Sequence, residues 1–232
     1  RRVEGVYVGL AKFGLAYCFR REVEAGRLDM RDFSEVAMLA RLRAAAEGVS
    51  FLPTKALLGT GMAAHNPDQV REITCPFTGE KYHAVEAATS DFTVMHGYVG
   101  DEYGNIQWPI QRDTDNLDFL LAKAAKRLIV TVEKMVPHEE VTRQPTMTYI
   151  PHLWVEAIVE VPYGAHPCAC DGYYDEDEEH LQYYQECARD PVRFQEYVNK
   201  HVYGVENHWQ YLREALPVDA LVKLSLIHIS EP

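Results

Sequence analysis

The chain has 232 residues, 47% hydrophobic and 25% charged, which are ordinary values for a globular protein and enough for one domain with a sizeable core. Its formal net charge of −12 argues against nucleic acid or an anionic membrane as the main partner, because phosphate binding needs clustered Lys and Arg. Five cysteines, an odd number in a chain of this size, argue against a disulfide scaffold and favour a reducing, cytoplasmic compartment.

The first part of the chain alternates between short apolar runs and helical patterns. A helix is predicted over residues 35–47, because Ser34 is a favoured N-cap residue and Gly48 is a natural helix stop. Residues 60–69 are rich in turn formers, and residues 51–53 are interpreted as a buried connection. The other elements predicted here are a helix over 15–25 and strands over 3–8, 28–33, 81–88 and 92–96.

A long loop is predicted over residues 97–115, and long ordered loops inside compact domains tend to be functional. It is followed by a helix over 116–125 and by apolar strands over 127–133 and 155–161. Fully apolar strands that alternate with helices predict a parallel or mixed sheet covered on both faces. No apolar run reaches the ~20 residues of a membrane span, so no membrane is expected as a partner.

The last third has a different composition. The acidic run 175–179 is expected to supply the first turn of a helix, where negative charge suits the helix dipole. Further helical stretches follow, with breaks near Pro191 and Gly204, and Pro191 suits a helix start. This part is predicted to be a helical extension packed on the α/β core.

Three stretches go beyond a general α/β pattern. They are FLPTKALLG at 51–59, followed by CPFTGE at 75–80; SDFTVMHGYVGDEYGN at 90–105; and VEVPYGAHP at 159–167. In order and spacing they resemble the alpha subunit of class I coenzyme A transferases, especially the glutaconate CoA-transferase branch, over roughly residues 3–204. The resemblance implies an open, mostly parallel α/β sheet flanked by helices, of the CoA-transferase and sugar-phosphate isomerase-like type, with a C-terminal helical extension.

The resemblance also bears on the two ends of the chain. Family members begin with further strand-helix units, so it implies a single domain over residues 1–223 that is truncated at its N-terminus. Residues 224–232, LSLIHISEP, are similar to a translated sequencing-library adapter and are expected to be an artefact tail. The alternative is a genuine terminal strand, since Leu226, Ile227 and Ile229 favour strands.

The function implied by the resemblance is transfer of CoA between carboxylic acids of the dicarboxylic or 3-oxo type. Such enzymes use a carboxylate nucleophile that forms acyl-anhydride and glutamyl-CoA intermediates, which splits one hard step into easier ones. In two-subunit members this glutamate lies in the beta subunit. The expected partner is therefore a beta subunit, in a heterodimer or higher heteromer, with the CoA thioester as substrate and no further cofactor.

Glu35 is the residue singled out for chemistry. It matches a place where relatives carry a glutamate that faces the site, and in a branch of steroid ring-opening CoA hydrolases that glutamate is the reacting carboxylate. Ring-opening hydrolysis by Glu35 is therefore the alternative function. The simpler interpretation is a first-turn helix charge, worth roughly 0.3–1 kcal/mol.

The other candidates are assigned to substrate binding: Ser34 at the helix start, His96, Asp101, Asn105 and His166. His96, Asp101, Gly104 and Asn105 match a recurrent H-x4-D-x2-G-N pattern of the family. The structural alternative, which the residue types favour, is that Asp101 and Asn105 bond their own backbone while Gly104 supplies a positive φ. For His166 in GAHP, the alternative is a hydrogen-bonded histidine that holds a turn.

Other chemistries are less well supported by the residues. Cys168 and Cys170 lack further ligands at zinc spacing, with only Asp171 and His180 nearby, so no metal is expected. A G-x-G-x-x-G motif after a strand is missing, which disfavours a nicotinamide-binding domain. A ligand-sensing domain of the sugar-phosphate isomerase-like fold is a third interpretation, since a fold does not determine function, but no basic helix-turn-helix is visible.

Overall fold

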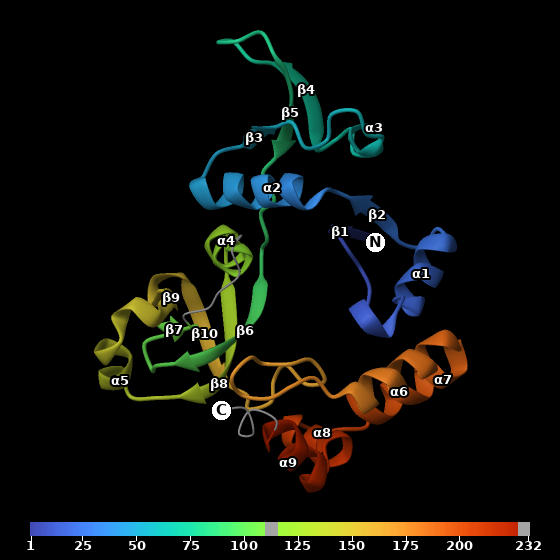
Figure 1. Ribbon diagram of the computed structural model, residues 1–232, viewed down its shortest axis with the longest axis vertical. Helices are drawn as coiled ribbons and strands as arrows, with labels where there is room; N and C mark the ends of the chain where they lie inside the picture. Colours follow the sequence, from blue (N-terminus) through green and yellow to red (C-terminus); the bar gives the residue numbers. More distant parts are fainter. Residues whose placement is uncertain (110–115, 227–232) are drawn as a thin grey trace. The chain divides into compact units, whose positions relative to one another are not determined.

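The computed structural model describes residues 1–109 and 116–226, and the chain divides into two compact units (Figure 1). Unit 1 comprises Arg1–Tyr7 and Asp29–Pro162, and unit 2 comprises Val8–Leu28 and Tyr163–Pro232. Unit 1 holds the strands named below, whereas unit 2 is mainly helical.

Unit 1 contains a five-stranded mixed sheet in the order β10-β8-β6-β7-β9. Strands β6, β8 and β10 are parallel, whereas β7 is antiparallel to both β6 and β9. The α/β class and the sheet flanked by helices are therefore as predicted. The strands are β6 (Thr93–Gly100), β7 (Ile106–Gln107), β8 (Leu128–Met135), β9 (Thr148–Ile150) and β10 (Val155–Glu160).

Two smaller sheets lie in the described part of unit 1. β1 (Arg2–Gly5) and β2 (Asp29–Asp32) are parallel, while β5 (Lys81–Glu86) pairs antiparallel with β3 (Phe51–Thr54) and with β4 (Val70–Thr74). The interpretation of residues 51–53 as a connection was wrong, because these residues form β3 despite the proline. Strand β4 was not predicted, since its charged residues conceal the alternation that a half-buried strand shows.

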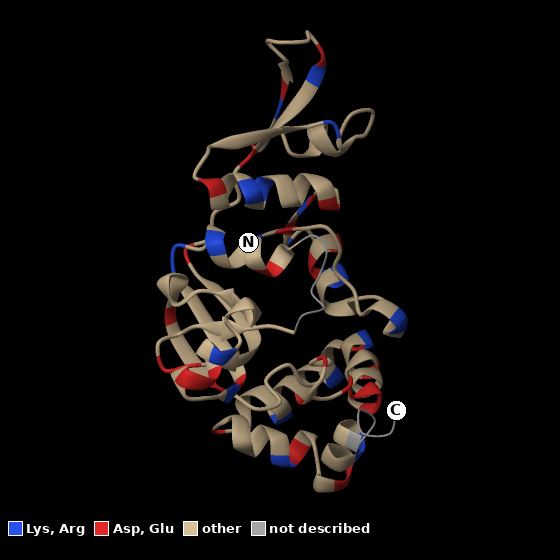
Figure 2. Cartoon of the chain, turned by 60° about the vertical axis from the view of Figure 1, so that its left-hand side comes forward, with Lys and Arg blue, Asp and Glu red and all other residues tan. Residues whose placement is uncertain are grey.

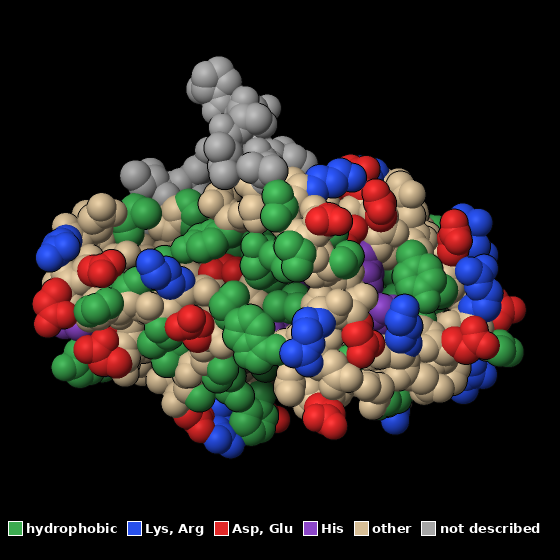
Figure 3. All heavy atoms as spheres, turned by 90° about the horizontal axis from the view of Figure 1, so that it is seen from below, with side chains coloured by type: hydrophobic (Ala, Val, Ile, Leu, Met, Phe, Trp, Pro, Cys, Tyr) green, Lys and Arg blue, Asp and Glu red, His purple; other side chains and the backbone are tan. Residues whose placement is uncertain are grey.

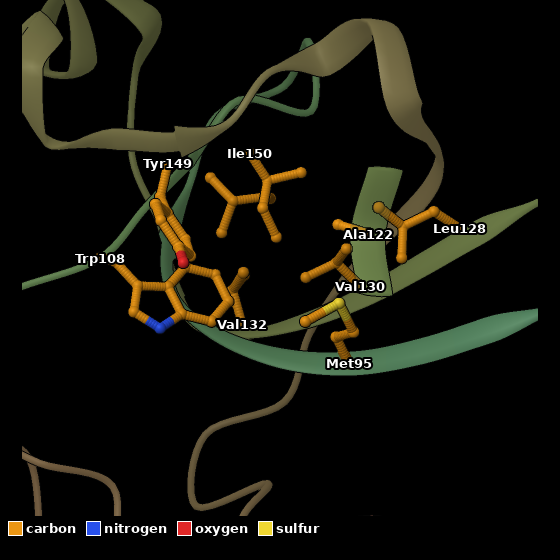
Figure 4. Packing of buried hydrophobic residues seen from close by; sticks show 9 residues of the cluster. Met95, Trp108, Ala122, Leu128, Val130, Val132, Tyr149 and Ile150 are labelled. Carbon is orange, nitrogen blue, oxygen red and sulfur yellow. The ribbon is translucent and has the colours of Figure 1, made fainter. Parts of the chain in front are cut away.

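Side chains from one face of β6 and β8 form the main core of unit 1. Figure 4 shows Met95, Val130 and Val132 converging with side chains from α4, β9 and the segment after β7. The rings of Trp108 and Tyr149 lie 5.5 Å apart, centroid to centroid. Because successive residues of a strand face opposite sides, His96, Thr131 and Glu133 stand on the other face of this sheet.

The helices of unit 1 follow local signals closely. Helix α2 (Glu35–Glu47) has the predicted bounds and ends at Gly48, whose φ of 73° is left-handed. The other helices are α3 (Met62–His65), α4 (Leu117–Ala124) and α5 (His138–Arg143), with 3₁₀ turns at Pro145–Met147 and His152–Trp154. The loop predicted over 97–115 was too long, because β6 extends to Gly100 and β7 follows; residues 110–115 lie outside the described residues.

Unit 2 contains a 3₁₀ turn at Ala11–Phe13 and α1 (Tyr17–Glu24), followed by four later helices and one π-helical turn. Asp177 caps α6 through its carboxylate, and Glu178 and Glu179 stand in the first turn, so the acidic run supplies the start of a helix as predicted, although Asp175 and Glu176 precede the cap. Pro191 begins α7, as predicted. The elements are α6 (Glu178–Arg189), α7 (Pro191–Val198), the π-turn η4 (Asn199–Tyr203), α8 (His208–Ala215) and α9 (Val218–Leu226).

The segment expected to be an artefact tail is only partly described. Leu224 is buried and belongs to α9, and the Ser225 hydroxyl lies 3.0 Å from the hydroxyl of Tyr163. Residues 227–232, which complete that segment, lie outside the described residues.

Charged side chains of both signs are spread along the chain, on helices and on the antiparallel strands β4 and β5 (Figure 2). On the face seen in Figure 3, they are scattered among hydrophobic side chains, and histidine shows only in small areas. Over residues 1–109 and 116–226, every helix is too short or too polar to cross a lipid bilayer.

Candidate functional site

A cleft of about 610 Å³ opens within unit 1, between the sheet and two helices. Clefts of this size between packed elements are the usual places for small-molecule sites. One wall is the beginning of β6 with the residues that precede it, and the others are β1, α2 and α4. Its lining includes Glu4, Met38, Leu42, Ser90, Phe92, Thr93, Val94, Met95, His96, Leu117, Asp118 and Leu121.

The acidic residue contributed by β1 is held by an almost completely buried arginine. Arg41, which is 2% exposed, places Nη1 2.8 Å from Oε2 of Glu4 and donates from Nε to the Glu86 carbonyl at 3.0 Å. Its guanidinium also lies 4.3 Å from the ring centre of Phe33, and Gln69 donates to the other oxygen of Glu4. The charge of Glu4 is thus balanced, so this carboxylate shapes the wall and is poorly placed to act as a free base.

His96 lines the cleft and is held by two side chains of the neighbouring strand. Its Nε2 lies 2.6 Å from Oε1 of Glu133, and its Nδ1 lies 2.8 Å from the Thr131 hydroxyl. Glu133 is buried, so the imidazole N–H that it accepts satisfies a carboxylate that would otherwise be costly to bury. Both ring nitrogens of His96 are therefore occupied by protein partners.

Ser34 and Glu35 begin helix α2. The Ser34 hydroxyl accepts the Ala37 N–H at 3.3 Å, which confirms the predicted N-cap. Glu35 is exposed, and among the described residues its carboxylate makes no hydrogen bond or ion pair. Met38 and Leu42, three and seven positions further along, line the cleft. Such positions share one face of a helix, so Glu35 stands at the end of the helix face that forms this wall.

Asp101 organises the turn that follows β6. Its Oδ1 accepts the N–H groups of Tyr103 and Asn105 at 3.1 and 2.8 Å, and its Oδ2 accepts from the Asn105 amide at 2.8 Å and from His138 Nδ1 at 2.7 Å. Burial alone would raise the pKa of Asp101, but the hydrogen bonds from His138 and Asn105 outweigh it and lower that pKa. Gly104 has a φ of 95°. These contacts support the turn interpretation of Asp101 and Asn105.

His166 belongs to unit 2, whereas the other predicted site residues belong to unit 1. It is buried, with Nδ1 2.7 Å from the Tyr211 hydroxyl and Nε2 3.1 Å from Oδ2 of Asp177. Burial lowers its pKa, against the opposing effect of Asp177. The side chain is therefore part of a polar cluster inside unit 2.

Three residues of the site were missed from the sequence: Glu4, Arg41 and Glu133. A signal existed for Glu133, because Thr131 and Glu133 are polar residues two positions apart in the apolar strand RLIVTVE and so share one face. Arg41 carries no comparable signal within its helix. Its pairing with Glu4, 37 residues away, depends on how β1 and α2 pack.

Residues 1–161 match the family model described as coenzyme A transferase. The chain belongs to the coenzyme A transferase family. The matched segment contains every residue of the cleft in unit 1. The recognition of this family from the sequence is thereby confirmed.

Relatives of this coenzyme A transferase chain include components of different enzymes. It is 32% identical to a glutaconate CoA-transferase subunit of Acidaminococcus fermentans, over 90% of this chain and 69% of that protein. It is 29% identical to a cholesterol ring-cleaving hydrolase IpdA subunit of Rhodococcus jostii, over 83% of this chain and 67% of that protein.

Among solved structures, that of glutaconate coenzyme A-transferase from Acidaminococcus fermentans superposes with a TM-score of 0.89 and 29% identity, covering 97% of this coenzyme A transferase chain and 74% of that one. The chain is shorter than its relatives. It spans 46% of the length of an uncharacterized protein of Archaeoglobus fulgidus, to which it is 36% identical over 91% of its own length.

Proposed function

We propose that this chain is the alpha subunit of a CoA-transferase that moves CoA between carboxylic acids of the dicarboxylic or 3-oxo type. The observation that carries the proposal is its similarity to glutaconate CoA-transferase, in sequence over 90% of the chain and in fold over 97% of it. In this proposal a beta subunit supplies the nucleophilic glutamate and completes the enzyme.

The chemistry assigned to the complex balances without any other reactant. In the beta subunit, the glutamate carboxylate attacks the thioester carbonyl and releases CoA thiolate, leaving an acyl anhydride. The thiolate then attacks the glutamyl carbonyl, which gives glutamyl-CoA and the free acid. The second acid reverses these steps and leaves as the new thioester. Dividing the reaction in this way replaces one difficult exchange by easier ones.

The alpha subunit contributes the acyl side of the site in this proposal. Its cleft has an apolar wall of Met38, Leu42 and Leu121, suited to the carbon chain of an acyl group. Glu35 stands at the end of that wall as a carboxylate without a partner among the described residues, and polarises or positions the acyl group. Ser34 sets the backbone direction there by capping α2.

The remaining predicted site residues hold other parts of the protein in position. His96, held by Thr131 and Glu133, presents its ring to the cleft. Asp101 and Asn105 hold the turn after β6. His166 keeps the turn after β10 connected to α6 of unit 2 through Asp177. Under this proposal, replacing His96, Asp101 or Asn105 changes the position of substrate more than the chemical step.

A ring-opening CoA-thioester hydrolase is the second candidate. It is favoured by Glu35, which is exposed and has no partner among the described residues, since a carboxylate that acts on substrate must be free to reach it. The similarity to a cholesterol ring-cleaving hydrolase component points the same way. The two candidates differ in which subunit carries the reacting carboxylate.

The test co-expresses the chain with a CoA-transferase beta subunit. For a transferase, the isolated alpha subunit is expected to be inactive and the complex active. The complex should also form a borohydride- and hydroxylamine-sensitive glutamyl-CoA adduct on the beta chain when given an acyl-CoA. CoA transfer by the isolated alpha subunit would contradict the proposal. An active complex without any adduct on the beta chain would favour the hydrolase.

A further inference from the structure

A second set of chemistry-bearing side chains lies inside unit 2. His166 follows β10, Asp177 is the N-cap of α6, and His180 is in the first turn of that helix. One ligand atom of each lies within 4.8 Å of the ligand atoms of the other two. The rings of His166 and His180 are 5.2 Å apart, centroid to centroid, and both side chains are buried.

A further histidine beside this group is buried without partners. His201 is 6% exposed, and neither of its ring nitrogens has a hydrogen-bond partner among the described residues. Its ring centre lies 5.1 Å from that of His180. A buried polar atom left unpaired costs about 1–3 kcal/mol and in native proteins calls for an unseen water or ion. His201 comes from the π-turn η4, and such turns occur frequently at functional sites.

The outer partners of these histidines suit metal ligation. His166 has Nδ1 2.7 Å from the Tyr211 hydroxyl, and His180 has Nε2 2.8 Å from the Tyr197 hydroxyl. Each of these contacts gives one ring nitrogen an outer partner, as metal-binding histidines usually have, and Nε2 of His166 faces Oδ2 of Asp177 at 3.1 Å inside the cluster. The Oδ1 atom of Asp177 accepts the His180 N–H and so caps α6, whereas its Oδ2 atom faces Nε2 of His166.

Access to the cluster is through an acidic cleft of about 940 Å³ on unit 2. Asp177 and His180 line it together with other carboxylates, namely Asp175, Glu176, Glu178, Glu179 and Asp219, and with one lysine, Lys223. Some of these charges are balanced, since Lys12 pairs with Glu176 and Glu178, and Lys223 with Glu179. A cleft lined by an excess of one sign raises the local concentration of the opposite ion.

We infer that His166, Asp177 and His180 form a site for a first-row transition-metal dication of the zinc type, with the buried and unpartnered ring of His201 next to His180. Two or three imidazoles and one carboxylate are a donor set typical of zinc, with metal–ligand distances of about 2.0–2.2 Å. No metal was expected from the sequence, because the search for ligands started from Cys168 and Cys170. The three proposed ligands are two histidines and an aspartate, and neither cysteine is among them.

The experiment measures Zn²⁺ binding by the full chain, first stripped with a chelator and then titrated against a chromophoric chelator, with Co²⁺ absorption as a second readout. Asp177→Asn keeps an oxygen to cap α6 but weakens the ligand, and Asp175→Asn is the matched control in the same acidic run. The site predicts one Zn²⁺ per chain, a loss of affinity of ~10-fold or more in Asp177→Asn, and a much smaller loss in Asp175→Asn, which removes one charge from the cleft but no ligand.

His180→Gln, which keeps a polar group near Tyr197, should weaken binding to a similar extent and serves if Asp177→Asn fails to fold. The Co²⁺ spectrum of the wild type should show visible bands of a low-symmetry nitrogen and oxygen site, and these should disappear in both ligand variants. Equal affinity in Asp177→Asn, Asp175→Asn and wild type, or less than one Zn²⁺ per chain, would overturn the inference. Because the readout is binding, the result is independent of CoA-transfer activity.

Discussion

The Nδ1 atom of His138 lies 2.7 Å from Oδ2 of Asp101, a carboxylate that has no exposed surface. The contact joins the turn after β6 to the first residue of α5. Asp101 also accepts three hydrogen bonds from Tyr103 and Asn105. One buried carboxylate therefore holds together a turn and a helix that are 37 residues apart in the sequence.

This arrangement predicts a loss of stability in acid. The pKa of Asp101 is lowered in the folded protein from an ordinary value of 3.8, because its hydrogen bonds outweigh the effect of burial. Its contribution to the free energy of unfolding is therefore complete above about pH 4 and is lost as pH falls through the lower folded pKa. Asp101→Asn should cost about 1–3 kcal/mol at pH 7 and progressively less below pH 4.

Urea unfolding of wild type and variant between pH 3 and pH 7 measures this difference. Asp68→Asn, an exposed aspartate of the same unit, is the control and should follow the wild type at every pH. A constant difference between Asp101→Asn and wild type across the whole range would contradict the assignment.

Glu35→Gln separates the two enzyme candidates, because it keeps the shape of the side chain and removes its charge. If Glu35 is the reacting carboxylate of a hydrolase, kcat should fall by about 10²–10⁴. If the beta subunit carries the nucleophile, the loss should be smaller, should appear partly in KM, and should leave the glutamyl-CoA adduct intact. Steady-state kinetics and adduct trapping on the complex measure both. Glu47→Gln, at the other end of α2, controls for a change of helix charge.

Glu133→Gln tests whether the His96 ring is positioned from β8. A Gln side chain can still reach Nε2 but no longer offers a carboxylate, and replacing a charged hydrogen bond inside the protein should cost about 1–3 kcal/mol. The imidazole ¹⁵N shifts of His96 should change at the same time, because the partner of Nε2 has changed. Unaltered shifts in a folded variant would show that Glu133 does not position the ring. Glu160→Gln, at the end of β10, where Oε2 accepts the Met135 N–H at 3.1 Å, is the control for neutralising a hydrogen-bonded carboxylate of the same sheet.

Gly97→Ala tests the packing on the core face of β6. A Cβ at this position would lie 2.7 Å from Cγ2 of Ile106 and 2.9 Å from the Trp108 ring. Both neighbours are buried, so the overpacking should cost about 1–3 kcal/mol. Gly61→Ala, where the nearest side-chain atom is 3.8 Å away, should change the midpoint of thermal unfolding little. Equal melting temperatures for the two variants would contradict the packing described here.

Local signals in the sequence were sufficient for several elements and for the family. Ser34 and Gly48 gave both ends of α2, and Pro191 gave the start of α7, because caps and prolines act on the backbone within a few residues. The turn at Asp101 and Asn105 could also be anticipated, since its hydrogen bonds span at most four residues. Strands β6, β8 and β10 were predicted from their apolar runs, although the predicted ends differ from the observed ones.

The partners of the site residues were decided only by the tertiary structure. His96 meets Glu133 because β6 and β8 pair in a register that places His96 opposite Thr131, and no pattern within either strand specifies that register. Arg41 forms a hydrogen bond with Glu4 because separate elements pack together. His166 lies near Asp177 and His180 for the same reason. The physical reason is that helix caps and side-chain periodicity depend on neighbours along the chain. The contacts that hold a buried charge or gather metal ligands depend on which distant surfaces are buried together.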